Sequence, residues 1–378
     1  MKKIHISLVG GQPVPVYIGI KNDGQANTVV LVCSPQSRLE AERIQEQFPK
    51  REFQIRECSP TDLLQIEDLA HELKEKYKDY EATINLTSGT KLWSLSFFSV
   101  FSDHTNVHFV YVDQNNLMVD ILTKEKRQCN IDRQTRFKLH GTPLKSFFSI
   151  NEFTKADKKV LEDVEKLRRK NSKAFSIMTN NIDKAKLDED GVITDDESGS
   201  SIHHYHLPNW AEITVKGRSA PITKQLQSEH VFDILFNAGW FELKTALEFK
   251  KNPHVKEVWL NCIFADADGN AKNEIDIIVE LGTRLLFVEC KTAVFNVTDI
   301  DKFRSALRNF SGTSSSGIFV TYERPYNDKT REKYNHAMEK CKDNDIKTFN
   351  FSLWRDDPDN NPSLNDIINE LLHRENKR

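Results

Sequence analysis

The sequence predicts an α/β protein with two domains, and three observations lead to this fold class. The chain has 378 residues, enough for two hydrophobic cores at roughly 150 residues per domain. Its first third alternates short β-branched segments with helical periods, the order of a parallel sheet covered by helices. Its second half reads as helices, a three-stranded meander and further alternating helices and strands. We therefore expect domains at residues 1–145 and 216–378, joined by a helical and acidic linker region at 146–215.

In the first domain, five strands are expected at residues 4–9, 28–33, 53–57, 81–86 and 107–113. Segments of helical periodicity lie between them at 38–48, 62–77 and 90–101. Such an order gives a largely parallel, Rossmann-like sheet with helices on both faces. Because ligands of these sheets bind beyond the carboxyl ends of the strands, the loops at those ends are the candidate binding site.

Three strand ends carry small or polar residues. They are Gln12 and Pro13 after the first strand, Ser34 after the second, and the run Thr87, Ser88, Gly89, Thr90 and Lys91 after the fourth. Small residues let a ligand approach the backbone, and a helix starting near Thr90 offers free N–H groups beside the Lys91 ammonium. The run therefore suits phosphate, although it also fits an ordinary helix cap. Neither GxxxxGK[ST] nor GxGxxG occurs, so an NTPase or a dinucleotide enzyme is not supported.

In the second domain, helices are expected at 226–236 and 240–250, then strands at 257–265, 274–280 and 284–291. Further elements are expected at 299–310, 317–322 and 346–351. Residues two apart in a strand share a face, so Glu289 and Lys291 point the same way. Asp276 lies in the preceding strand, which a short hairpin can bring alongside. Charges among apolar strand residues are costly unless they are paired or bound to metal.

These charged residues predict a metal-dependent site for phosphodiester hydrolysis. Acidic oxygens recruit Mg²⁺ or Mn²⁺, the ion polarises a phosphate and acidifies a water, and Lys291 can orient that water or neutralise developing charge. The candidate set from this reasoning is Asp276, Glu289 and Lys291, with both acids as metal ligands. A structural Glu–Lys ion pair is the competing interpretation.

The polar loop after the first strand and the Thr87–Lys91 run resemble the CRISPR-associated Rossmann fold (CARF) domain, which senses cyclic oligoadenylates. The resemblance covers roughly the first 140 residues by element order. It implies a homodimer that binds a ring, cyclic tetra-adenylate, across both copies of these loops. Gln12, Pro13 and Ser34 would line the ring, and residues 87–91 would hold its phosphates and riboses. Ser88 stands where this family commonly has glycine.

The second domain is similar to the PD-(D/E)xK nucleases, specifically the restriction-endonuclease-like half of CARF nucleases. Asp276 matches the first acidic position, Glu289 and Lys291 the E-x-K element, and Glu242 the acid of the preceding helix. The resemblance therefore implies that these four residues are catalytic and that the three acids are metal ligands, with Glu229 or Glu248 as alternatives to Glu242. The proline of the nominal motif is absent, because Ile275 precedes Asp276. The resemblance implies an endonuclease of type III CRISPR antiviral defence that cuts DNA, with single-stranded RNA as a further option, when cyclic tetra-adenylate binds.

Composition excludes several other classes. The 53 Lys and Arg against 56 Asp and Glu give a net charge of −3, so the chain does not coat nucleic acid non-specifically. No apolar run approaches the roughly 18 residues of a membrane span, and the N-terminus lacks the pattern of a signal peptide, so a cytoplasmic protein is expected. The six cysteines form no CxxC pair, which favours reduced core thiols. The cluster His203, His204 and His206 favours a surface or edge strand over a metal site.

Two other functions remain open at this stage. One is a non-catalytic cyclic-oligoadenylate sensor whose second half only binds DNA and regulates. The other is a nuclease of DNA repair or junction resolution that acts without the ring. Cleavage of supercoiled plasmid, with and without ligand, separates these functions from the first. A sensor domain that degrades its own ring is also compatible with the sequence.

Overall fold

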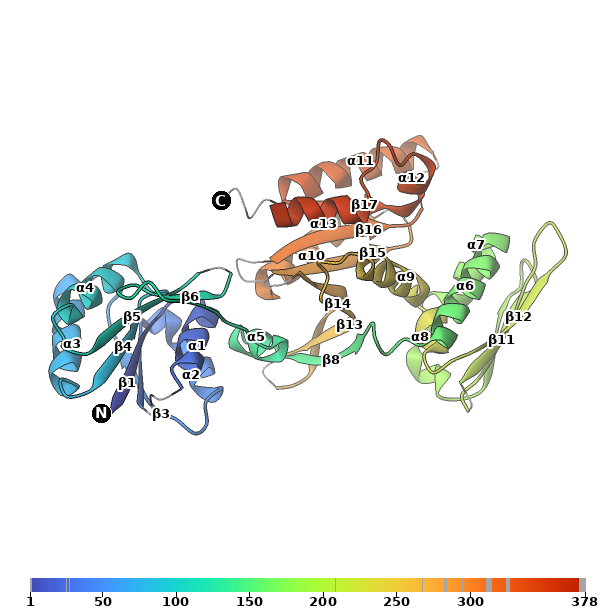
Figure 1. The fold of residues 1–378 in the computed structure, drawn as a ribbon. Helices are drawn as coiled ribbons and strands as arrows, with labels where there is room; N and C mark the ends of the chain where they lie inside the picture. The colour runs from blue at the N-terminus through green and yellow to red at the C-terminus, as the bar shows by residue number, and fades with distance from the viewer. Residues whose placement is uncertain are drawn as a thin grey trace. The chain divides into compact units, whose positions relative to one another are not determined.

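The computed structural model of the protein describes residues 2–24, 26, 28–113, 115–207, 209–266, 268–281, 284–293, 295–310, 315–323 and 327–373. The chain forms two compact units, shown in Figure 1. The first contains residues 1–145 with 264–272 and 312–314, and the second contains residues 146–263, 273–311 and 315–378. Residues 146–215, expected to act as a linker region, fold within the second unit. No helix in the described ranges is long and apolar enough to cross a membrane.

The first unit is built on a seven-stranded sheet of order β3-β2-β1-β4-β5-β6-β7. Its strands are β1 (Lys3–Val9), β2 (Thr28–Cys33), β3 (Glu52–Glu57), β4 (Glu81–Asn85), β5 (Val107–Val112), β6 (Leu117–Asp120) and β7 (Lys126–Gln128). Strands β1 to β5 are parallel, and β6 and β7 extend the sheet as an antiparallel hairpin. The five predicted strands and the Rossmann-like order are confirmed.

Five α-helices surround this sheet: α1 (Pro13–Asn22), α2 (Arg38–Glu46), α3 (Leu63–Lys76), α4 (Lys91–Phe101) and α5 (Arg133–Leu139), with a 3₁₀ turn η1 (Pro35–Ser37). Buried residues of α1 and α2 share one core with one face of the strands, and those of α3 and α4 share a core with the other face. Helix α1, hairpin β6–β7 and α5 were not predicted. Pro13 occupies the start of α1, where its missing N–H costs nothing.

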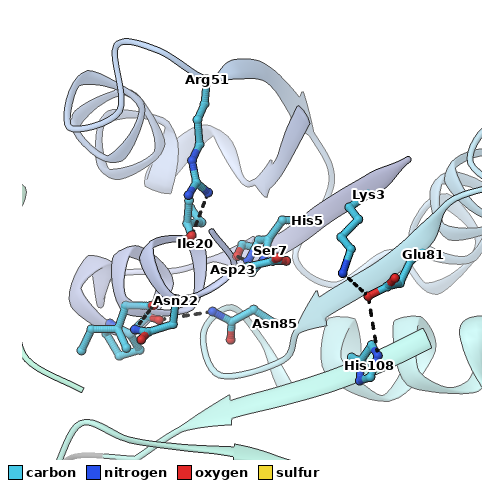
Figure 2. A network of polar contacts seen from close by, with 12 residues as sticks. Lys3, His5, Ser7, Ile20, Asn22, Asp23, Arg51, Glu81, Asn85 and His108 are labelled. Carbon is cyan, nitrogen blue, oxygen red and sulfur yellow. Dashed lines mark hydrogen bonds and ion pairs between the residues drawn. The ribbon is translucent and has the colours of Figure 1, made fainter. Parts of the chain in front are cut away.

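A buried polar network holds α1 against the first sheet (Figure 2). His5 is fully buried, and its Nδ1 lies 3.0 Å from Asp23 Oδ2 at the end of α1 while its Nε2 lies 2.9 Å from Ser7 Oγ. The Asn85 amide donates to the Pro15 carbonyl at 3.2 Å. The atom order is that of a Ser–His–Asp triad, but Ser7 is also fully buried. The network therefore positions α1 and its N-terminal loop.

The second unit contains a six-stranded sheet of order β17-β16-β15-β14-β13-β8. Its strands are β8 (Leu144–Ser149), β13 (Glu257–Ala265), β14 (Ala271–Leu281), β15 (Arg284–Lys291), β16 (Ser315–Thr321) and β17 (Ile346–Asn350). β14 and β15 are antiparallel, whereas β15, β16 and β17 are parallel. The associated helices are α8 (Val231–Leu235), α9 (Gly239–Lys250), α10 (Val297–Phe310), α11 (Asp328–Asp343), α12 (Phe351–Asp356) and α13 (Leu364–His373).

A second, four-stranded antiparallel sheet belongs to the same unit, with the order β12-β11-β10-β9. It consists of β9 (Gly191–Asp195), β10 (Ser200–Tyr205), β11 (Trp210–Val215) and β12 (Ile222–Gln227), preceded by α6 (Lys155–Lys170), α7 (Ser172–Thr179) and the 3₁₀ turn η2 (Lys184–Leu187). The predicted helix at 226–236 is wrong, because its first residues end β12 and only α8 is helical. β12 alternates exposed and less exposed side chains, as an antiparallel strand does.

Candidate functional site

Strands β14 and β15 bring the predicted acidic residues to one face of the second unit's sheet. Ile277 pairs with Val288 in the antiparallel register, and both are fully buried. Residues opposite each other share a face, and faces alternate along each strand. Asp276 and Glu289, each one residue further along, therefore both lie on the other face. Lys291 lies two residues beyond Glu289 and points the same way.

Two charged groups of this face, Glu289 and Lys291, contact each other, and Asp276 is bonded to the backbone beside them. Lys291 Nζ pairs with Glu289 Oε1 at 2.7 Å, and the Cys290 N–H donates to Asp276 Oδ2 at 2.6 Å. Burial and the nearby Glu289 carboxylate raise the pKa of Asp276 to about 8. Burial opposes the charge of Lys291, but Glu289 and Asp276 hold the pKa of that ammonium above its ordinary value. Two acids and one ammonium thus form an electrostatically linked group.

A pocket of about 360 Å³ opens beside this group. Its lining includes Glu242, Glu274, Asp276 and Lys291, with Asn261 among its other polar residues. Glu242 comes from the first turn of α9, so the helix and the strands supply acids to one pocket. The two acids considered as alternatives to Glu242 do not line this pocket. Glu248 pairs with Lys251 at 2.6 Å, and Glu229 is exposed before α8.

Three non-glycine residues that line this pocket have left-handed backbone. The φ angles are 51° at Asn237, 66° at Ala238 and 50° at Asn261. Such conformations cost free energy and concentrate at functional sites. Asn237 is fixed from outside, since its side chain accepts from the Ile182 N–H and donates to the Ile182 carbonyl, both at 2.9 Å. The turn that aims α9 into the pocket is therefore held in place by the segment after α7.

The donor chemistry of the pocket fits a hard divalent cation, because its ligating side chains are carboxylates. In the part of the chain that the structure describes, no three His, Cys, Asp or Glu side chains are gathered closely enough to hold a metal ion. Glu289 is paired with Lys291, and one Asp276 oxygen accepts a backbone N–H. An ion would therefore compete with these internal partners for the carboxylate oxygens.

At the carboxyl edge of the first sheet, the two predicted loops meet. Ser88 Oγ accepts from the Gly10 N–H at 3.0 Å and donates to the Gln12 carbonyl at 3.3 Å. A Cβ on Gly10 would lie 2.8 Å from the Gly89 nitrogen, so the loops approach at backbone contact. The N-terminus of α1, after Gln12, and that of α4, after Thr90, both begin here. Two helix N-termini and several backbone N–H groups are suited to a phosphodiester ligand.

The predicted ring contacts differ in how accessible they are. Gln12, Gly89 and Lys91 are exposed. Ser34 and Ser88 are buried: Ser34 caps η1 with Ser37, and Ser88 holds the first loop. Thr87 and Thr90 also use their hydroxyls internally. Thr87 donates to Asn85 at 2.6 Å and accepts from Val112 at 2.7 Å, while Thr90 caps α4 and Pro13 is buried in α1. The serines and threonines among the predicted ring contacts therefore stabilise the conformation of the loops through internal hydrogen bonds.

A second pocket, of about 350 Å³, lies in the first unit between α1 and hairpin β6–β7. Two of its acids already have partners: Asp23 contacts His5 at 3.0 Å, and Asp120 contacts His108 at 2.9 Å. The pocket of the second unit is the stronger candidate site, because strained backbone and the Asp276 group coincide there.

The remaining sequence candidates are structural. His204 is buried in β10, with its ring 6.1 Å from that of Phe232, and His203 pairs with Glu212 across the sheet. All six cysteines are free and buried. Asn237 and Asn261 also line the pocket, and the sequence pattern did not predict either of them. Asn261 is an amide within an apolar strand, a signal that could have been read, whereas nothing in the spacing marks Asn237.

Comparison with known proteins assigns the first unit. Residues 4–140 match the family model of the Card1 CARF domain. The match runs from β1 to α5 and includes both loops. The comparison with curated proteins found no match. The CARF assignment agrees with the sheet order and the loop positions described above.

Two solved structures resemble nearly the whole chain. Can2 from Sulfobacillus thermosulfidooxidans, in complex with cyclic tetra-adenylate, has a TM-score of 0.62 at 16% identity, over 92% of this chain and 95% of that chain. Protein VC1899 from Vibrio cholerae has a TM-score of 0.68 at 14% identity, over 94% of this chain and 95% of that one. At such identities the likeness concerns the fold, which extends over both units.

Proposed function

We propose that the protein is a metal-dependent endonuclease that a cyclic oligoadenylate activates through the CARF domain, as an effector of type III CRISPR antiviral defence. The main support for this proposal is the pocket that Glu242, Asp276 and Lys291 line. It belongs to a chain whose first 140 residues include a CARF domain. The fold likeness to Can2, a protein solved with cyclic tetra-adenylate, supports that ring as the activator. DNA is the first substrate to test, and single-stranded RNA the second.

Ligand recognition rests on the paired loops of the CARF domain. The backbone N–H groups at the start of α4 would face phosphates, and the exposed Lys91 ammonium adds a positive charge. Helix α1 contributes mainly the positive end of its dipole, because Pro13 and Pro15 in its first turn have no N–H. Gln12 is exposed beside them and provides an amide for a base or ribose. Ser88, Thr87 and Asn85 hold the loops in this shape before the ligand arrives, which lowers the ordering cost of binding.

Hydrolysis rests on the residues of the second unit's pocket. Asp276, with Glu242 or Glu289, would hold Mg²⁺ or Mn²⁺, which supplies a Lewis acid for the phosphate and lowers the pKa of a bound water. Lys291 directs an ammonium to the same face and neutralises charge that develops on the phosphate. Its pairing with Glu289 keeps it protonated. The left-handed turn at Asn237 and Ala238 sets the direction of Glu242.

The CARF domain also has an apolar surface beside the ligand loops, which favours a homodimer. Leu95 and Phe98 on α4 and Tyr111 on β5 are exposed. Phe98 packs on Phe109, with ring centroids 4.7 Å apart, so these side chains belong to one surface. Clustered exposed apolar side chains mark interaction sites. A second copy on this surface would place two sets of loops on one ring.

The Phe98→Glu variant is expected to be monomeric and to bind cyclic tetra-adenylate at least about tenfold more weakly, because a buried carboxylate opposes association and the second set of loops is lost. Light scattering after size exclusion and isothermal titration measure the two effects. Leu207→Glu is the control, since Leu207 is exposed in the second unit. A dimeric Phe98→Glu protein with wild-type affinity would show that this surface is not the interface.

The activity itself is tested with supercoiled plasmid. Wild-type protein should cut only when cyclic tetra-adenylate and Mn²⁺ or Mg²⁺ are both present. Lys291→Ala should lower the cutting rate by about a hundredfold or more, because the ammonium no longer stabilises the transition state, and should keep the ring affinity. Full cutting by Lys291→Ala would remove this residue from the site. Ring binding without any cutting would favour the non-catalytic regulator, and cutting without the ring would favour the repair nuclease.

A further inference from the structure

Arg168 lies near the end of α6 and has no role in the proposed function described above. Its side chain is nearly buried, at 7% exposure. The guanidinium lies over the Trp240 ring, 4.7 Å from its centroid, and over the Tyr322 ring, 4.5 Å from its centroid. It also pairs with Glu323 at 2.5 Å. A planar cation that meets two rings and a carboxylate uses the properties that distinguish Arg from Lys.

Each partner of Arg168 is joined to a different part of the candidate nuclease pocket. Trp240 precedes Glu242 by two residues in the first turn of α9. The Tyr322 N–H donates to the Lys291 carbonyl at 3.2 Å, and the Glu323 N–H donates to the Thr292 carbonyl at 3.1 Å. Arg168 therefore contacts the helix that carries Glu242 and the strand end that is bonded to Lys291.

A second contact fastens α6 to α9. Lys244 on α9 forms an ion pair with Glu165, one turn before Arg168. The N-terminus of α6 is also fixed, because Thr154 and Asp157 form a capping box. Along the chain, α6 is the first helix after β8 and so the first to follow the CARF domain. A displacement of α6 would act on the pocket through Arg168 and Glu165.

We propose that Arg168 is a positioning residue: it holds α9 and the β15 end at the spacing that the nuclease pocket needs. This inference rests on the proposed function for its catalytic consequence. The contacts on which it depends all lie within the second unit. Loss of the guanidinium would leave Glu323 without its cation and would remove the cation that lies over both the Trp240 and the Tyr322 ring, which themselves meet edge to face with centroids 5.1 Å apart.

The test compares Arg168→Lys and Arg168→Met with Arg169→Ala in the full-length protein. Arg169 is the adjacent residue on α6, with an exposed side chain that only reaches Glu165 at 3.8 Å. Both Arg168 variants should lower the ring-activated kcat by about tenfold or more, with unchanged KM and ring affinity, because positioning affects the transition state and not substrate binding. Arg168→Lys should not rescue, since a compact ammonium lacks the planar fork that pairs with Glu323 while the guanidinium lies over the rings. Arg169→Ala should stay within about twofold of wild type.

Hydrogen exchange gives a readout that does not need cutting. Peptides covering residues 239–244 and 289–293 should exchange faster in Arg168→Met than in wild type, and peptides of the CARF domain should not change. Failure of wild-type protein to cut would count against the proposed function alone, because hydrogen exchange still reports whether Arg168 holds α9 and the β15 end in place. Unchanged exchange in both segments, or a ring-activated kcat within about twofold of wild type, would overturn the role of Arg168.

Discussion

The Asp276→Asn variant is expected to lose about a thousandfold in cutting rate and, without metal at alkaline pH, to melt at a higher temperature than wild type. The rate loss corresponds to ~4 kcal/mol of barrier. It follows from removing a carboxylate that lines the pocket, accepts the Cys290 N–H and is a proposed ligand of the ion. The stability gain follows because a buried negative charge is replaced by a neutral amide of similar shape.

The sign of the pH effect is set by the raised pKa of Asp276. Burial and Glu289 raise this pKa to about 8 in the folded protein, whereas an unfolded chain has an Asp pKa of about 3.9. The folded state therefore holds a proton that the unfolded state has released. Its stabilising contribution is complete below pH 4 and is lost as the pH rises through about 8. The asparagine variant lacks this loss, so the difference in melting temperature should grow from acid to alkaline pH.

Melting curves between pH 4 and 9 in the presence of a chelator measure this difference. Asp268→Asn provides the matched control, because Asp268 lies exposed in the turn before β14. Mn²⁺ should raise the melting temperature of wild type and of the control more than that of Asp276→Asn, since an ion that binds only the folded state stabilises it. Identical pH profiles for the Asp276 and Asp268 variants would contradict the assigned burial of this charge.

The fold of the CARF domain could be read from the sequence where apolar runs are continuous. The strand at 28–33 is buried along almost its whole length and consists largely of Val and Leu, so its composition alone identifies it. Helix α1 was missed because its sequence, PVPVYIGIKN, contains two prolines and several β-branched residues. Tertiary contacts decide its structure, through the bonds of His5 and Asn85 to its end and its first turn.

In the second unit, the sequence predicted the meander because each strand ends at a polar turn. The strands at 257–265 and 284–291 have the predicted bounds. The four-stranded sheet was only partly foreseen. In β12, the side chains of Ile222, Lys224 and Leu226 are less exposed than those of the residues between them, which is a period-two pattern. The last residues of this strand were joined to the following α8 and interpreted as one helix.

The candidate site was predictable to the extent that it lies on neighbouring strands. Hairpin register places Asp276 and Glu289 on one face without any long-range information. Glu242 required the packing of α9 on the sheet, and the same helix carried a competing acid in Glu248. Arg168 lies roughly 70 residues before α9 in the sequence, so its contact with Trp240 depends on tertiary structure that no local pattern encodes.

The Gly239→Ala variant is expected to destabilise the second unit by about 3 kcal/mol, because the α8–α9 junction has no room for a side chain. A Cβ at this position would lie 1.7 Å from the Asp233 carbonyl oxygen and 2.9 Å from its carbon. These atoms belong to the backbone of α8, which Ile234 and Leu235 anchor in the core. The clash can be relieved only by moving α8 or the start of α9.

Movement at this junction would also displace the candidate pocket of the second unit, since Asn237, Ala238 and Glu242 line it on either side of Gly239. Gly24→Ala is the control, because a Cβ there would meet no atom within 4 Å. Urea unfolding should show the transition of the second unit at a lower concentration in Gly239→Ala, with the CARF transition and ring affinity unchanged, and the folded fraction should cut more slowly. Wild-type stability and cutting would mean that the tight turn is neither rigid nor needed to aim Glu242.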